Sequence, residues 1–265
     1  MITKQEYLLS VPFEYILGFS KETKLIRSNG CFTKKDFVQR LIASLEIAEC
    51  KQIYEDYKNG ESYKRSVNWF LTKFPTGQFI GKSFVENQNN FAQKNFFFEF
   101  PISKTRVDIL HLLNSFHAYE IKSQRDKLNR LNYQIPALRQ FFENVSLIIP
   151  SASCSEVMKT IDEKIGIITF LPEDNKISFE VARESTPMGE YNPTAQLNIL
   201  QISELRDIYF HNIGPVTKKL GRSDLIEKVV NRLPFSQIND LFKQTIRKRT
   251  KIGNQQDLFE NQTLD

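Results

Sequence analysis

Four short apolar segments lie close together in the middle of the chain, and they constrain its fold more than any other feature. They read NFFFEFPI, RVDIL, HAYEIKS and VSLIIPS, and all fall between residues 95 and 151. Phenylalanine, valine, isoleucine and tyrosine favour strands, and polar residues separate the runs. Between the third and fourth segments, residues 126–142 change to the spacing of a helix. The sequence therefore predicts three strands, a helix and a fourth strand, in that order.

The residues on either side of these segments have different patterns. Before them, TKKDFVQRLIASLEIAEC predicts one continuous helix with Thr33 as its N-cap. After them, GIITFLP and KISFEVARE predict a hairpin around EDN. Residues 185–200 contain two prolines and a glycine, which is typical of a linker. The tail that follows has helical periods, with Ser223 and Ser236 as candidate N-caps.

We therefore expect an α/β protein with an αβββαβ core and helical regions at both ends. The predicted parts are a helical N-terminal region (1–80), the core with its added hairpin (81–184), the linker (185–200) and a basic helical C-terminal region (201–265). The composition is that of an ordinary globular protein, with 40% hydrophobic and 25% charged residues.

The apolar runs and the cysteines indicate the cellular compartment of the protein. No apolar run approaches the roughly 18 residues that a membrane helix needs. The first residues do not have the pattern of a signal peptide. Cys31, Cys50 and Cys154 are odd in number and widely spaced, which does not indicate a disulfide framework or a zinc site. We expect a cytoplasmic protein that does not insert into membranes.

The charge is concentrated near the C-terminus. Ten basic and three acidic residues lie between Lys218 and Lys251, a local net charge of +7, compared with +5 for the whole chain. Such a patch is typical either of solvated helices with a basic tail or of a surface that contacts nucleic acid. The residues with which it would bind phosphates are Lys218, Lys219, Arg222, Arg247, Lys248 and Arg249.

One pair of charges stands apart from its surroundings. In HAYEIKS, period-two alternation puts Glu120 and Lys122 on the same face of a strand. The chain has six acid-x-Lys triplets, so the triplet alone carries little information. This triplet differs because its strand follows directly on another strand that contains an acid, Asp108.

These three residues suit the hydrolysis of a phosphodiester. That reaction needs a cation to offset the charge that builds up on the phosphate. It also needs an attacking water molecule whose pKa is lowered, so that it becomes a better nucleophile. Mg²⁺ is usually bound through one or two carboxylates, and Asp108 and Glu120 on neighbouring strands can converge on one ion. Lys122 can then orient the water or stabilise negative charge. The alternative is a strand whose polar face is simply wet, with Glu120 and Lys122 paired across strands.

The segment also resembles a known superfamily. Asp108, eleven further residues and then EIK on a strand resemble the PD-(D/E)XK nucleases, which have the restriction-endonuclease-like fold. More narrowly, RVDIL…HAYEIKSQRDKLNRLNYQI is similar to a bacterial family of largely uncharacterised proteins. In that family an R-x-D strand precedes a YEIKS strand and a D-x-L-x-R-L-x-x-Q helix. Val107 stands where the superfamily name has proline.

The resemblance implies Mg²⁺-dependent hydrolysis of DNA, with Mn²⁺ able to substitute. It implies that Asp108 and Glu120 bind the metal and that Lys122 is catalytic. Many members use a further acid, for which Glu86 in a helix and Glu99 in a strand are the candidates, with a slight preference for Glu86.

Three polar residues around this motif are further candidates. Gln134 begins a pattern similar to the Gln-to-Tyr helix of exonuclease-like members, although Leu138 replaces the tyrosine. Gln134 and Arg130 lie one helical turn apart, where each can either face the site or serve as a helix-surface or strand-packing residue. Arg106 is expected to contact nucleic acid. His111, His117 and His211 are expected to pack or to form hydrogen bonds rather than to bind zinc.

Two other functions are compatible with these residues. One is a non-catalytic module on the nuclease fold that binds nucleic acid or a protein partner, since fold does not determine function. The other is a component of a phage-defence or mobile-element system, with the helical regions offering surfaces for a homodimer or for another protein.

Overall fold

A computed structural model describes most of the chain, and it divides that chain into two compact units. The described residues are 2–25, 33–88, 95–102, 105–124, 126–173, 176–187, 189, 191–216 and 220–252. The first unit comprises Met1–Asn87 and Phe170–Phe179, and the second comprises Gln88–Thr169 and Glu180–Asp265. None of the helices in these described residues is both long and apolar enough to cross a membrane.

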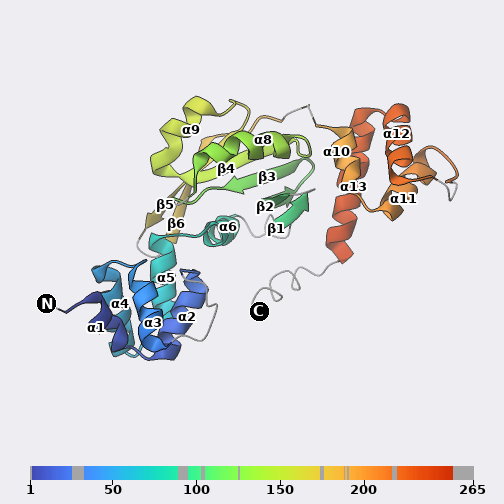
Figure 1. Cartoon of the computed structure of the whole chain (residues 1–265). Coiled ribbons are helices and arrows are strands. Elements are labelled where there is room, and N and C mark those ends of the chain that lie inside the picture. Colours follow the sequence, from blue (N-terminus) through green and yellow to red (C-terminus); the bar gives the residue numbers. More distant parts are fainter. Residues whose placement is uncertain are drawn as a thin grey trace. The chain divides into compact units, whose positions relative to one another are not determined.

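In the first unit, the helices between Lys4 and Lys73 form a bundle around an aromatic and aliphatic core (Figure 1). Large buried side chains such as Phe19, Leu41, Ile53 and Phe70 fill that core. The helices are α1 (Lys4–Leu9), α2 (Phe13–Thr23), α3 (Lys34–Ile42), α4 (Ile47–Lys58), α5 (Tyr63–Lys73) and α6 (Gly77–Glu86). The sequence predicted a boundary after residue 80, but the first unit extends to Asn87 and includes the whole of α6.

The helix predicted across TKKDFVQRLIASLEIAEC is in fact two helices, α3 and α4. Thr33 caps α3 as expected, and its side chain accepts a hydrogen bond from the N–H of Asp36. The helical pattern breaks after Ile42, and a new helix starts beyond Glu46, whose N–H donates to the Glu49 carboxylate at 2.7 Å. Leu45 in the break is buried, so its apolar spacing reflects packing of the turn and not a continuous helix.

The second unit contains most of a six-stranded sheet in the order β1-β2-β3-β4-β5-β6. The strands are β1 (Phe96–Ile102), β2 (Thr105–Leu112), β3 (Phe116–Ile121), β4 (Asn144–Pro150), β5 (Gly166–Glu173) and β6 (Lys176–Arg183). Strands β1, β2 and β3 pair antiparallel, whereas β3 and β4 are parallel. The predicted order of three strands, a helix and a fourth strand is confirmed, and the protein has the expected mixture of helices and sheet.

Helices between the strands cover part of the sheet. The short 3₁₀ helix η1 (Leu128–Arg130) leads into α8 (Leu131–Arg139), which lies across β3 and β4 (Figure 1). After β4 come η2 (Ser151–Ser153) and α9 (Cys154–Thr160). Pro136 lies inside α8, which continues only to Arg139.

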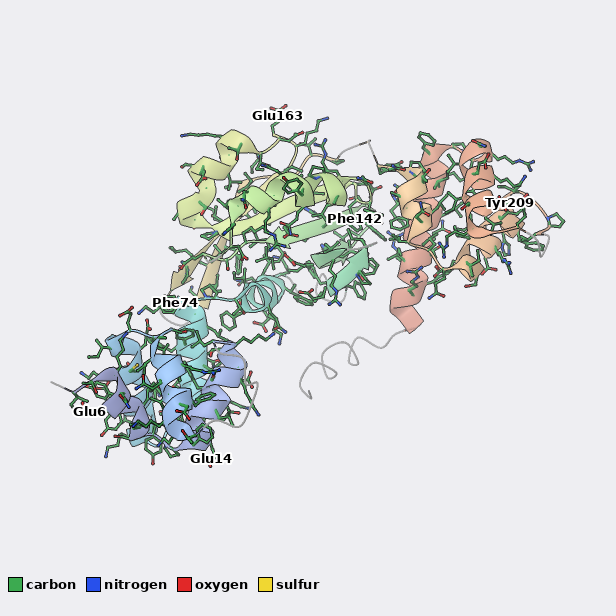
Figure 2. All side chains as sticks on the ribbon, viewed as in Figure 1. Glu6, Glu14, Phe74, Phe142, Glu163 and Tyr209 are labelled. Atoms are coloured by element: carbon green, nitrogen blue, oxygen red, sulfur yellow. The ribbon has the colours of Figure 1, made fainter. Side chains whose placement is uncertain are left out.

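The C-terminal part of the second unit is a set of packed helices. They are α10 (Pro193–Asn198), α11 (Ile202–Asn212), α12 (Arg222–Arg232) and α13 (Phe235–Ile252). Phe142 after α8 and Tyr209 on α11 belong to the one large apolar cluster that joins this part to the sheet; both are labelled in Figure 2. The predicted linker therefore contains a structured element, because α10 buries Leu197 in this core.

The N-caps predicted for the last two helices are wrong. The residue before α12 is Gly221, whose N–H donates to the Asp224 carboxylate at 3.1 Å. Ser223 lies within that first turn, and Ser236 lies inside α13, which already begins at Phe235. In the first case an acid one turn into the helix binds the free backbone N–H, so no serine is needed there.

Candidate active site

The acids predicted from the sequence lie where strands β2 and β3 separate. The backbone pairing between these strands ends with Ile109 opposite Tyr119. One residue further along, the same register places Asp108 opposite Glu120 and on the same face of the sheet. There the N–H of Ile121 donates to Oδ2 of Asp108 at 2.7 Å. The Asp108 carboxylate therefore occupies the opening between the two strands.

Glu120 and Lys122 form a buried ion pair with Gln134. The ammonium of Lys122 donates to Oε1 of Glu120 at 2.7 Å and to Oε1 of Gln134 at 2.7 Å. The amide of Gln134 in turn donates to Oε1 of Glu120 at 2.5 Å. Glu120 and Lys122 are only 3% and 4% exposed. All three side chains are thus held in one closed triangle of hydrogen bonds.

Helix α8 brings Gln134 to this pair. Leu131, Ile135 and Leu138 recur at helical spacing and are buried in the apolar cluster against the sheet. Gln134 projects from the same side of the helix, one turn after Leu131, and so reaches the polar end of that interface. The sequence expectation that Gln134 faces the acids agrees with this geometry.

The loop between β3 and α8 is closed by a local contact. Asp126 Oδ2 accepts hydrogen bonds from the N–H of Ser123 at 2.8 Å and from its hydroxyl at 2.6 Å. These contacts give a structural reason for the serine and the aspartate that follow EIK in the sequence.

Burial makes the two acids unusually basic. It raises the pKa of Asp108 to about 7, and the neighbouring Glu120 carboxylate contributes to the increase, while the Ile121 N–H opposes it. Burial also raises the pKa of Glu120, against the effect of Lys122 and of the Gln134 amide. Two carboxylates held close together in a buried place carry a free-energy cost that a cation would relieve.

The donor set fits a hard cation. Among the described residues, no hydrogen bond reaches Oδ1 of Asp108 or Oε2 of Glu120, so one oxygen of each carboxylate can take a ligand. In the same part of the chain, no three His, Cys, Asp or Glu side chains are arranged to enclose a metal ion. Mg²⁺ does not require such a cage, because it commonly binds one or two carboxylates and fills its other positions with water or phosphate oxygens.

Of the two candidates for a further acid, Glu99 is the one with an interaction at Asp108. The pairing of β1 with β2 is in register on both sides of Glu99, from Phe98 with Ile109 to Phe100 with Val107, which places it opposite Asp108. Its charge also contributes to the raised pKa of Asp108. Glu99 has a positive φ of 51°, an uncommon backbone conformation for a residue in a strand.

Glu86, the other candidate, is the last residue of α6. It belongs to the first unit, whereas Asp108 and Glu120 belong to the second. Its role as a further acid stays a prediction, as does that of Glu99.

Two arginines predicted to contact nucleic acid lie around the cluster. Arg106 is exposed, and its guanidinium is 3.9 Å from the Glu99 carboxylate. Arg130, at the end of η1, is also exposed, and its charge lowers the pKa of Glu120. Both therefore lie within electrostatic reach of the acids.

Some arginines of the C-terminal basic region make contacts inside the protein. Arg249 donates to both carboxylate oxygens of Glu204, with the Nε hydrogen bond at 2.6 Å. Arg222 donates to the carbonyl oxygens of Asn198 at 3.2 Å and Leu200 at 2.8 Å. These contacts hold α12 and α13 to their neighbours, a structural role that the charge count did not predict.

The remaining basic residues differ in exposure. Arg247 donates to the carbonyl of Leu113 and lies over the Phe116 ring at 5.2 Å. Lys248 is exposed. Lys218 and Lys219 lie outside the described residues, so their predicted role in binding phosphate stays a prediction.

Comparison with known proteins gives three matches. The sequence model of the family described as Bacteriophage P4 protein cII matches residues 77–263. Protein cII of Enterobacteria phage P4 is 26% identical over 144 residues, and the chain spans about half of that relative (54% of each protein). Among solved structures, a protein of unknown function from Silicibacter pomeroyi aligns with a TM-score of 0.35 and 15% identity, over 52% of this chain and 91% of that one.

Proposed function

The chain belongs to the bacteriophage P4 protein cII family, and we propose that it is a metal-dependent nuclease that hydrolyses phosphodiester bonds, with DNA as its substrate. The observation that carries this proposal is the cluster of Asp108, Glu120, Lys122 and Gln134. Two carboxylates each keep one oxygen available beside a buried ammonium, on adjacent strands and beneath one helix.

The order of elements supports a restriction-endonuclease-like core. Three antiparallel strands are followed by α8 and then by β4, which lies parallel to β3. The acids come from the second and third of these strands, and Gln134 comes from the helix that follows. This arrangement has the αβββαβ order predicted from the apolar segments, which is compatible with the core of the PD-(D/E)XK superfamily.

Asp108 and Glu120 would hold the metal ion through their available oxygens, with Mg²⁺ as the preferred ion and Mn²⁺ as a substitute. Among the described residues, Glu99 lies opposite Asp108 in the register but does not form a three-acid metal site with Asp108 and Glu120, so the two-carboxylate arrangement carries the proposal. When bound, the ion supplies positive charge at the phosphate and makes water more acidic. Its positive charge would also offset the repulsion between the two carboxylates and so reduce the free-energy cost of burying both of them.

Lys122 has a defined part in this proposal. An ammonium has three N–H donors, and Glu120 and Gln134 accept two of them. The third remains for a water molecule or a phosphate oxygen, at which it would stabilise negative charge. Gln134 positions Lys122 and Glu120, because its amide donates to one and accepts from the other.

The test is a cleavage assay with plasmid and single-stranded DNA in the presence of Mg²⁺ or Mn²⁺, and with EDTA as the metal-free control. Lys122→Met should reduce cleavage by at least about 100-fold, because it removes the donor at the phosphate but keeps the aliphatic volume. Lys164→Met is the matched control, since Lys164 also follows an acid by two residues but is exposed. That variant should cleave like the wild type.

Thermal unfolding followed by circular dichroism should accompany the assay, to separate loss of activity from loss of folding. The nearly isosteric Asp108→Asn provides a second inactive variant. Equal cleavage by the wild type and by a folded Lys122→Met protein would refute the proposal. Calorimetric titration with Mn²⁺ that detects no binding, or binding indifferent to Asp108→Asn, would instead favour a non-catalytic binding module.

A further inference from the structure

Tyr133 on α8 is unusually exposed for a large aromatic side chain. It is 81% exposed, more than any other large apolar side chain in the described part of the protein. Tyr119 and Tyr209, by contrast, are 7% and 8% exposed. Single exposed apolar residues are common on protein surfaces, so exposure alone does not make Tyr133 a site. Its position relative to the acids does.

Arg130 links Tyr133 to the candidate active site. Arg130 precedes Tyr133 by three residues and Gln134 by four, so its side chain lies next to each of them, whereas Tyr133 and Gln134 are consecutive and diverge around the helix. Gln134 hydrogen bonds to Glu120 and Lys122, so Arg130 lies between the cluster and the exposed ring of Tyr133.

The same surface is positively charged. Lys127 and Arg130 are exposed, and no ion pair neutralises either of them among the residues that the structure describes. Asp126, the adjacent acid in the sequence, hydrogen bonds to Ser123 and forms an ion pair with neither cation in the described residues. An exposed aromatic ring next to unpaired cations is the combination with which proteins bind unpaired nucleotides, through stacking on the base and attraction of the phosphate.

We propose that Tyr133 and Arg130 form a binding subsite for an unpaired nucleotide next to the candidate active site. The ring of Tyr133 stacks on the base, and the Arg130 guanidinium binds the adjoining phosphate. The subsite selects single-stranded or frayed nucleic acid, because a base inside a duplex has both faces covered by its neighbours. The strand bound here would be the one that is cut, and only this last point rests on the proposed function.

The test measures binding without cleavage. Fluorescence anisotropy of a labelled single-stranded oligonucleotide, in EDTA, gives the dissociation constants of the full-length protein and its variants. Tyr133→Ala should weaken binding by about tenfold, and Tyr133→Phe should remain within about twofold of the wild type, because phenylalanine keeps the stacking surface. Phe210→Ala is the matched control, since Phe210 is also exposed (57%) but lies on α11.

A second measurement reports stacking itself. The emission of 2-aminopurine changes when the base stacks, so an oligonucleotide that contains it should respond to the wild type and to Tyr133→Phe, but less to Tyr133→Ala. Arg130→Gln should weaken binding and reduce its salt dependence while the stacking signal of the bound complex remains. Binding of a blunt duplex should be weaker than that of the single strand and should not change with Tyr133→Ala.

The outcomes separate this inference from the proposed function. Equal affinity of Tyr133→Ala and the wild type for single strands, or a preference for duplex DNA, would overturn the subsite while leaving the nuclease assignment in place. Conversely, the expected binding pattern in a protein that never cleaves with Mg²⁺ or Mn²⁺ would support the subsite and refute the nuclease.

Discussion

The two faces of strands β2 and β3 each bury a polar cluster, but the clusters differ in kind. On one face, Asp108 and Glu120 lie beside Lys122 and Gln134 beneath helix α8. On the other, His111 and His117 are cross-strand neighbours. Successive side chains of a strand point to opposite faces of the sheet, so Tyr119 lies on the histidine face and its neighbour Glu120 lies on the acid face.

On the histidine face, both ring nitrogens of His117 lie near a hydroxyl, whereas Nε2 of His111 is buried without a hydrogen-bond partner among the described residues. Nε2 of His117 lies 2.8 Å from the hydroxyl of Ser146, and the hydroxyl of Tyr119 lies 3.3 Å from its Nδ1. The rings of His117 and Tyr119 stack at 4.2 Å, and those of His111 and Phe96 at 3.9 Å. Burial lowers the pKa of His117 to about 3 and that of His111 to about 4, so both are neutral near pH 7.

The comparison shows how a structural polar cluster differs from a candidate site. Both clusters shift the pKa values of their members, so a perturbed pKa does not identify a site. The histidines shift toward their neutral form, which costs less to bury than an ion, and their rings stack on Phe96 and Tyr119. The acids on the other face stay costly to ionise, and each keeps an oxygen available. Among the described residues, the candidate site differs from the histidine face in having two ionisable carboxylates, each with one oxygen that accepts no hydrogen bond.

The largest expected effect is on the pH dependence of stability, through His117. Its pKa in the folded protein is below the ordinary value of 6.5, so the unfolded chain takes up a proton at a pH where the folded chain does not. Stability therefore falls as the pH falls below about 6.5 and continues to fall toward about 3. In urea unfolding, His117 and His111 should each contribute a loss of about 2 kcal/mol between about pH 7 and about pH 5, and His117→Gln should remove the share of His117, about half of the histidine effect.

The contribution of Asp108 to the pH dependence of stability has the opposite sign to that of His117, so the experiment must separate the two contributions. Its pKa is raised in the folded protein, so it favours folding as the pH falls from about 7 toward 3.8. The loss of stability on acidification should thus be steeper in an Asp108→Asn background. A profile that stays flat in that background would contradict a neutral, buried His117.

The second prediction concerns the acid face directly. Asp108→Asn should stabilise the metal-free protein near pH 8 by about 1 kcal/mol, or about 2–4 °C in Tm, because an amide is not ionised and can still accept from Ile121. Mg²⁺ or Mn²⁺ should raise the Tm of the wild type but not that of the variant. Differential scanning fluorimetry measures both.

Asp162→Asn is the matched control for that variant. Asp162 is on the surface and accepts hydrogen bonds from Arg139 and from the N–H of Lys164, which lower its pKa. The same substitution there should leave the Tm unchanged or lower it, with the response to metal intact. A lower Tm for Asp108→Asn would mean that the Asp108 carboxylate stabilises the fold. The acid face would then be a structural cluster, like the histidine face.

The smallest expected effect is that of Tyr119→Phe on the histidine face. Removing the hydroxyl at Nδ1 of His117 should cost about 0.5–1 kcal/mol of unfolding free energy, with the ring stack retained. Nucleic-acid cleavage should not change, since Tyr119 points away from Asp108 and Glu120. Chemical unfolding combined with the plasmid assay checks both, and a loss of cleavage without a loss of stability would assign the histidine face a part in the site.

Much of the candidate site could be predicted from the sequence because it depends on short-range geometry. Period two determines that Glu120 and Lys122 share a face, and helical spacing determines that Arg130 and Gln134 do. The paired strands around Asp108 follow from their apolar residues and short turn. These are rules about neighbouring residues, so they need no knowledge of the rest of the fold.

Other features could not be predicted because they depend on contacts between distant segments. The split between α3 and α4 depends on the burial of Leu45, and the partners of Arg222 and Arg249 are 22 to 50 residues away. A count of charges treats those arginines as solvent-exposed. Their side chains instead bind carbonyls and a carboxylate that only the packing of α10–α13 brings within reach.

By itself, the sequence determined the order of strands and helices and the residue types of the acid face. The tertiary structure decided that Glu99 lies opposite Asp108, that Gln134 completes the triangle with Glu120 and Lys122, and that the histidines form a separate, neutral cluster. The reason is physical: periodicity assigns each side chain to a face of its own element, whereas only the register and packing of elements decide which faces meet.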